Sequence, residues 1–180
     1  MRLTSITQYY PNPLFRKSGA RHVQSGNGSM GYEAGDVHRF LILTSADDTG
    51  MQCSLNLKSL PPAGTRMVFS IGTFIPSGAT KFRNGCLAVL GLTDGGWTEV
   101  AKVGSDYAGH VGQAYTFVTE FVMPVHESPL QLIFNSPSIA NQSVTFDNPK
   151  LMTKDDWTRY QAMEDRPAYV YWDLMPLTRG

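Results

Sequence analysis

The chain has 180 residues, of which 42% are hydrophobic, 11% are aromatic and only 17% are charged. Fifteen basic and fifteen acidic side chains give a formal net charge of zero without any basic stripe, which argues against nucleic acid as a partner. No run approaches the ~20 apolar residues that span a bilayer, and the aromatic content argues against a disordered chain. One folded domain remains, long enough to form a core without disulfides or metals.

The first 31 residues show little periodicity, and we expect an N-terminal arm there. Tyr9–Phe15 contains two prolines. Each proline fixes its own φ and restricts the residue before it, so this stretch is predicted to be extended or turned. Ser25–Ser29 combines two glycines with an asparagine, which predicts a loop.

Short apolar runs separated by turn residues follow. Met51–Leu57 alternates apolar and polar residues, and this period of two predicts a half-buried strand. Arg66–Ile75 predicts a second strand, with Met67, Phe69 and Ile71 on one face. The other predicted strands are residues 37–44, 86–92, 97–103, 115–122, 130–134 and 143–151. About eight short strands at regular spacing predict an all-β fold, specifically an antiparallel β-sandwich or barrel.

The C-terminal part differs from the rest. Lys154–Met163 is predicted to be a helix, because Thr153 can cap it and Asp155 and Asp156 lie in the first turn, where the helix dipole favours acids. Beyond it, Tyr169–Trp172 is rich in aromatic residues and is expected to pack on the domain or to reach a neighbour. The predicted organisation is an N-terminal arm with a first strand and a loop over residues 1–31, a sandwich core over 32–152, and a short helix with an aromatic extension over 153–180.

The chain offers no convincing set of catalytic residues. Its histidines do not have the spacing of a zinc site, and we expect them in solvent-facing loops or on the sheets; they are His22, His38, His110 and His126. The nucleophile motif Gly-x-Ser-x-Gly is absent. Carboxylate pairs such as Glu33 and Asp36 occur in any chain of this length, so they do not indicate a glycosidase. We predict that the protein is not an enzyme.

The two cysteines, Cys53 and Cys86, form no metal-binding or redox motif. We expect both to be small buried hydrophobes in strands, and their spacing leaves open whether they pair.

Two aromatic residues lie in contexts that suit sugar recognition, because a flat ring can stack on the apolar face of a pyranose. Trp97 follows a Gly-Gly turn, and Tyr107 lies in the loop Gly104–His110, which is rich in Gly, Ser and Asp. Both are predicted glycan contacts. The alternative for Trp97 is a position in the core of a strand.

Four segments, in this order along the chain, resemble the minor tail proteins of phages that infect Gram-positive bacteria, chiefly actinobacteria. They are Asn12–Phe15, Gly64–Gly72, Val144–Met152 and Tyr171–Pro176. The modules of that family are similar to jelly-roll carbohydrate-binding modules. Leu174 and Met175 stand where the relatives have Gly-Asp, so the turn of this last element is altered here.

The resemblance implies a jelly roll in a virion, in a minor tail protein that helps to build the tail tip, with host cell-surface glycan as the expected ligand. It also implies a structural Ca²⁺ at Asp147, with backbone carbonyls near Asn12 as further oxygen ligands; the alternative is that Asp147 caps a turn. No other cofactor is expected. Contacts with other virion subunits, in a homo-oligomer, are expected at the terminal aromatic residues Tyr9, Tyr10, Phe15, Tyr169, Tyr171 and Trp172.

The main alternative is a capsid decoration or head-fibre protein with the same fold, anchored to the shell by its terminal arms. A cellular carbohydrate-binding module that has lost its enzyme is a third interpretation. The first residues lack the apolar stretch of a secretory signal, so we expect synthesis in the host cytoplasm and a final location in the virion.

Overall fold

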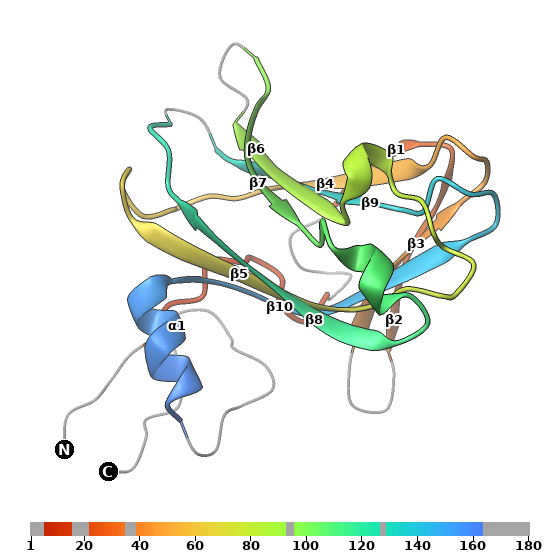
Figure 1. The fold of residues 1–180 in the computed structure, drawn as a ribbon. Helices are drawn as coiled ribbons and strands as arrows, with labels where there is room; N and C mark the ends of the chain where they lie inside the picture. Colours follow the sequence, from red (N-terminus) through yellow and green to blue (C-terminus); the bar gives the residue numbers. More distant parts are fainter. Residues whose placement is uncertain (1–5, 16–21, 35–38, 93–95, 127–128, 164–180) are drawn as a thin grey trace.

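The computed structural model describes residues 6–15, 22–34, 39–92, 96–126 and 129–163. They form two antiparallel five-stranded sheets packed face to face, with one short α-helix beside them (Figure 1). The predicted all-β sandwich is therefore confirmed, and its arrangement is that of a jelly roll. In the described part of the chain, no helix is both long and apolar enough to cross a membrane.

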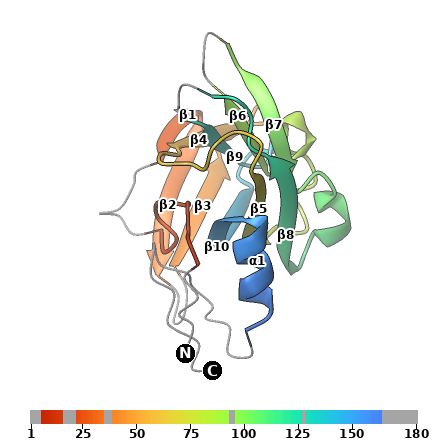
Figure 2. The ribbon, with the colours of Figure 1, turned by 90° about the vertical axis from the view of Figure 1, so that its left-hand side faces the viewer.

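Each sheet combines strands that are far apart in the sequence. The first sheet has the order β1 (Val23–Gly26), β4 (Met51–Asn56), β9 (Gln131–Asn135), β6 (Ala88–Leu92) and β7 (Thr98–Val103). The second sheet has the order β2 (Gly28–Ala34), β3 (Arg39–Ser45), β10 (Ser143–Thr153), β5 (Arg66–Phe74) and β8 (Ala114–Val122). Figure 2 shows β7 and β8, the last strands of the two sheets, at the same edge of the sandwich.

The core lies between the sheets, as the alternating pattern predicts. In β4 the side chains of Met51, Cys53 and Leu55 are buried while the residues between them are partly exposed. In β5 the predicted core face is buried, but Val68 and Ser70 on the opposite face are buried too. The reason is that the outer face of the second sheet is itself partly covered, as described below.

The N-terminal residues belong to the sandwich. The backbone N–H of Tyr9 donates to the carbonyl of Leu151 (2.8 Å), and the side-chain oxygen of Gln8 accepts from the N–H of Leu151 (2.7 Å). Tyr10 and Phe15 are buried in the main core. Residues 6–15 therefore pack on the sandwich, because a few anchoring side chains fix a segment that has no periodic pattern.

The loop predicted at Ser25–Ser29 is wrong. The structure places β1 and β2 there, separated only by Asn27, so that the chain passes from one sheet to the other. Gly26 has φ +88°, which favours glycine, and a Cβ atom on Gly28 would lie 2.3 Å from the carbonyl oxygen of Thr44. The glycines that indicated a loop are needed for a tight crossing between two strands.

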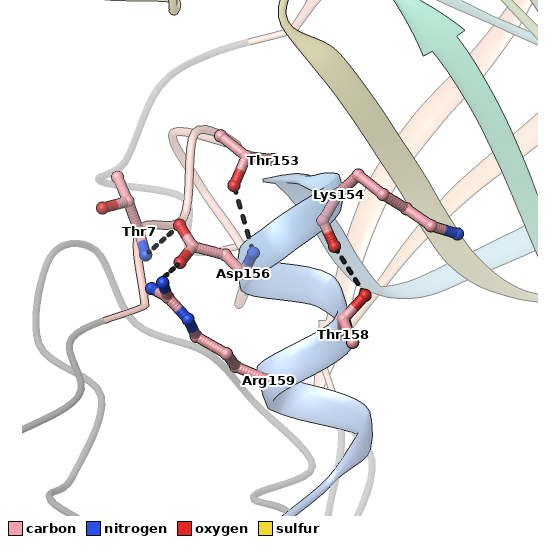
Figure 3. Close-up of polar contacts among 6 residues, drawn as sticks. All are labelled: Thr7, Thr153, Lys154, Asp156, Thr158 and Arg159. Atoms are coloured by element: carbon pink, nitrogen blue, oxygen red, sulfur yellow. Dashed lines mark hydrogen bonds and ion pairs between the residues drawn. The ribbon is translucent and has the colours of Figure 1, made fainter.

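The predicted C-terminal helix is confirmed as α1 (Lys154–Gln161), two residues shorter than expected. The side chain of Thr153 accepts from the N–H of Asp156 (3.1 Å), and the Asp156 carboxylate accepts from the N–H of Thr7 (3.2 Å) and pairs with Arg159 (3.3 Å; Figure 3). A small apolar cluster of Ile6, Met152 and Tyr160, with Trp157 and Met163 against it, joins the helix and the N-terminal segment to the outer face of the second sheet.

Candidate functional site

Trp97 lies on the outer face of the first sheet, just before β7. Its side chain is 45% exposed, so the alternative of a core position is wrong. The six-membered ring lies against Gly91 of β6, where a Cβ atom would come within 2.2 Å of the ring atom Cζ2. Because Gly91 has no side chain, the indole can pack directly against the backbone of β6. The part of the side chain that does not contact the strand is exposed to solvent.

A row of amide side chains continues from Trp97 across the sheet. Gly91 is in register with Gln131 of β9, and Gln131 is in register with Asn56 of β4. Their strand neighbours Leu90 and Leu132 point into the core, so these three residues lie on the outer face. Gln131 Nε2 donates to Asn56 Oδ1 (3.2 Å).

This surface, which we call the Trp97 face, has no charged side chain on its three central strands. Charged groups border it: Arg83 Nη1 donates to Gln52 Oε1 (3.3 Å), and Lys102 and Glu99 of β7 are in register with Val89 and Gly91. The residues on the outer side of β4, β9 and β6 are Gln52, Ser54, Asn56, Gln131, Ile133, Asn135, Val89 and Gly91. Among them, Asn135 and Val89 are buried by neighbouring groups. Amide groups both donate and accept hydrogen bonds. An exposed ring beside such groups can bind a neutral ligand that has an apolar face and many hydroxyl groups.

Tyr107, the other predicted glycan contact, lies beyond the opposite end of β7. It begins the 3₁₀ helix η2 (Tyr107–His110). Its ring packs edge-on against Phe82, with ring centroids 4.9 Å apart, and its hydroxyl donates to the carbonyl of Thr80 (3.3 Å). The six residues of β7 separate it from Trp97, so the structure does not bring the two aromatic residues together. Tyr107 thus holds its loop against the segment that contains Thr80 and Phe82. Its role in glycan binding stays a prediction.

The predicted assembly contacts fall into three groups. Tyr10 and Phe15 are 1% and 0% exposed, so they are core residues of this chain and the prediction that they reach a neighbour is corrected. Tyr9 is partly buried against the same core. Tyr169, Tyr171 and Trp172 lie outside the described residues.

The prediction that His22 faces solvent is wrong. His22 is 4% exposed, and its ring nitrogens Nδ1 and Nε2 lie 2.8 Å from the Tyr32 hydroxyl and 2.9 Å from the Tyr10 hydroxyl. Burial lowers the pKa of His22 from 6.5 to about 4. Sequence reasoning missed this site because a single histidine between irregular segments carries no periodic signal of burial.

Asp147 lies in β10, on the outer face of the second sheet beside Gly72. The carbonyl of Asn12, a predicted further ligand, accepts from the N–H of Phe15 (2.9 Å) in a turn. Within the described ranges, no three His, Cys, Asp or Glu side chains gather to form a metal-binding cluster. The Ca²⁺ site stays a prediction. Cys53 and Cys86 are both buried and unpaired.

Comparison with known proteins shows the fold. No family model and no curated protein matches the chain. Among solved structures, the enzymatically active domain of bacteriophage CBA120 tailspike protein 4 matches with a TM-score of 0.54 at 12% identity, over 83% of this chain and 21% of that chain. The Clostridium thermocellum xylanase 10B modules complexed with xylohexaose match with a TM-score of 0.51 at 10% identity, over 84% of this chain and 28% of that one.

A family 29 carbohydrate-binding module complexed with cellulohexaose is similar over 85% of this chain and 92% of its own length, with a TM-score of 0.49 at 14% identity. This chain spans well under half of the tailspike and xylanase chains. At such identities the likeness to the tailspike and xylanase structures establishes only the fold, a two-sheet β-sandwich.

Proposed function

We propose that the protein is a non-catalytic, glycan-binding minor tail protein of a phage virion, and that it binds host cell-surface glycan on the Trp97 face. The observation that carries this proposal is the exposed indole of Trp97 on Gly91, beside the amide row of Gln131 and Asn56. The jelly-roll fold, which carbohydrate-binding modules and a phage tailspike domain also have, supports it.

The chemistry of the face selects the class of glycan. The basic groups that border the face already have partners, because Lys102 pairs with Glu99 (3.6 Å) and Arg83 donates to Gln52 (3.3 Å). The central strands themselves present amides, a hydroxyl and apolar side chains. Neutral sugars match this surface, because the C–H face of the ring stacks on the indole while its hydroxyls exchange hydrogen bonds with the amides. The expected ligand is an uncharged polysaccharide of the host surface.

Binding to a glycan array and to isolated host cell walls tests the proposal. We expect wild-type protein to bind and Trp97→Ala to lose most of that binding. Phe74→Ala is the matched control, because Phe74 is 44% exposed but lies on the outer face of the second sheet. The assignment of the site would be contradicted if Trp97→Ala bound the glycan as well as wild type does. It would also be contradicted if Trp97→Ala and Phe74→Ala lost binding to the same extent.

The absence of catalysis is part of the proposal. The matched tailspike domain is described as enzymatically active, but this chain covers only 21% of it, so that activity does not transfer. Incubation of the protein with each glycan that it binds should release no new reducing ends. Measurable release would show that the protein is an enzyme.

The virion location is tested separately. Gold-labelled antibodies against the protein should mark the tails of phage particles in electron micrographs. Label over the heads would instead favour a capsid decoration or head-fibre protein, and unlabelled particles would exclude both.

A further inference from the structure

Figure 2 shows that β7 and β8 lie together at one edge of the sandwich. The side chains there form a groove. It has a volume of about 320 Å³, at the lower end of the range for small-molecule sites. Its lining residues are Lys102, Gly104, Ser105, Asp106 and Tyr115–Thr119. The groove begins at Lys102, near the end of β7 that is remote from Trp97, and its other lining residues lie after β7 or on β8. It therefore adjoins the edge of the Trp97 face but does not include Trp97.

An aromatic ring forms one wall of the groove and is held in place by its neighbours. Tyr115 is 40% exposed. His110 stacks on it with ring centroids 3.4 Å apart and an interplanar angle of 18°, and Phe117 packs edge-on at 4.8 Å. Phe117 itself is a core residue. The tyrosine ring is therefore fixed before any ligand arrives, which lowers the entropy cost of binding.

The polar groups of the groove balance each other in charge. Lys102 pairs with Glu99 (3.6 Å), and Asp106 lies 3.7 Å from Nε2 of His110. The hydroxyls of Ser105, Thr116 and Thr119 add groups that both donate and accept, and Thr119 also joins the two strands by donating to the carbonyl of Lys102 (3.4 Å).

We propose that this groove is a second carbohydrate subsite, which binds one neutral sugar ring as a branch or a chain end. The inference builds on the proposed glycan binding and adds a second point of attachment. The size of the groove suits a small ring, Tyr115 supplies a stacking surface, and the mixture of donors and acceptors suits hydroxyls. An anion would meet Asp106, and a cation would meet Lys102, so a neutral polyol is the class that fits.

Protein-observed NMR with methyl glycosides of glucose, galactose, mannose, rhamnose and N-acetylglucosamine tests the subsite. We expect at least one glycoside to shift the amide signals of Gly104–Asp106 and Thr116–Thr119. Asp106→Ala should weaken that binding about tenfold, because it removes a charged hydrogen-bond acceptor. The side chain of Asp106 is 74% exposed, so the alanine variant should stay folded.

Tyr115→Ala should also weaken binding, provided that its spectrum remains dispersed. Val122→Ala is the control, because Val122 lies on the same strand and is 57% exposed but does not line the groove; it should bind like wild type. The subsite is overturned if no glycoside shifts the groove signals at tens of millimolar. It is also overturned if the shifts persist unchanged in Asp106→Ala, or if they depend on protein concentration alone, which would indicate self-association through β8.

The two proposals fail in different ways. Shifts of the Trp97 indole signal without shifts in the groove would leave the Trp97 face standing and overturn the subsite. Shifts in the groove without any at Trp97 would support the subsite, and the Trp97→Ala comparison on the glycan array would then decide on the Trp97 face by itself. No shift at either place with any glycoside overturns the subsite, while the glycan array still decides on longer ligands at the Trp97 face.

Discussion

His22 couples the stability of the fold to pH. Its pKa is lowered by burial from 6.5 to about 4, so between these values the unfolded chain binds more protons than the folded one. Stability therefore falls as the pH drops from 6.5 towards 4, by up to about 3 kcal/mol from this residue.

Substitution by glutamine isolates this effect, because an amide side chain keeps hydrogen-bonding capacity without titrating. His22→Gln should be less stable than wild type at pH 7, since the amide fits the site between Tyr10 and Tyr32 less well than the imidazole does. The difference in stability between the two proteins should narrow by about 3 kcal/mol between pH 7 and pH 4. Urea unfolding of both proteins at the two pH values measures it, and parallel changes in stability would contradict the effect.

Lys150 is a buried cation, and its charge lowers the free energy of unfolding at neutral pH. It is 5% exposed, its Nζ donates to the carbonyl of Asn148 (3.4 Å), and it lies 5.5 Å from the centroid of the Tyr160 ring. Burial lowers the pKa of Lys150 from 10.5 to about 8, against the opposing effect of Asp147. The unfolded chain therefore takes up the Lys150 proton at a higher pH than the folded chain does. The free energy of unfolding falls as the pH drops from 10.5 through 8, and this loss is complete at pH 7.

Lys150→Met should raise the free energy of unfolding at pH 7 by about 1–3 kcal/mol, because a side chain of similar length replaces a buried charge. Lys81→Met, at an exposed position, is the control and should change it by less than about 0.5 kcal/mol. Chemical denaturation at pH 7 compares the two. A loss of stability in Lys150→Met would show that the amine makes interactions worth more than its desolvation.

At the scale of elements, α1 depends on its cap. Thr153→Ala removes the side chain that accepts from the N–H of Asp156 and should lower the free energy of unfolding by about 1 kcal/mol. Thr158→Ala is the control within the same helix, because its hydroxyl donates to a carbonyl that is already part of the helix (Figure 3). Denaturation curves in which the two variants lose equal stability would contradict the cap.

The sequence predicts the strands and the helix that have a local pattern. Period-two strands such as β4 and β5, and a helix with a cap residue, have local patterns, and each was placed correctly. The positions of β1 and β2 could not be predicted, because Gly26 and Gly28 are needed for a crossing between sheets but indicate a loop when read locally.

The candidate site was predictable only in part. Trp97 could be singled out from its Gly-Gly turn, but its exposure depends on Gly91, which lies on another strand. The amide row joins β6, β9 and β4, whose order in the sheet differs from their order in the chain. The sequence predicts that Tyr115 lies in a strand. It does not predict that Tyr115 contacts the Gly104–His110 loop, because that contact depends on how the two sheets pack.

For the whole molecule, two glycan-binding surfaces on one sandwich would act together. Single sugar sites on open surfaces bind weakly, and linking two sites raises avidity without new contacts. A virion that displays several copies multiplies this effect. Such an arrangement suits reversible attachment to a repetitive cell surface, and it needs no catalytic group.

The dissociation constant of an array-positive oligosaccharide, measured by calorimetry for wild type, Trp97→Ala, Trp97→Phe and Phe74→Ala, tests the central claim most directly. We expect about 30-fold weaker binding for Trp97→Ala, since a sugar that covers roughly half of the indole buries about 80 Å² at ~25 cal/mol/Å². Trp97→Phe should recover part of the loss, and Phe74→Ala should match wild type. Equal affinities for wild type and Trp97→Ala would contradict glycan binding on the Trp97 face.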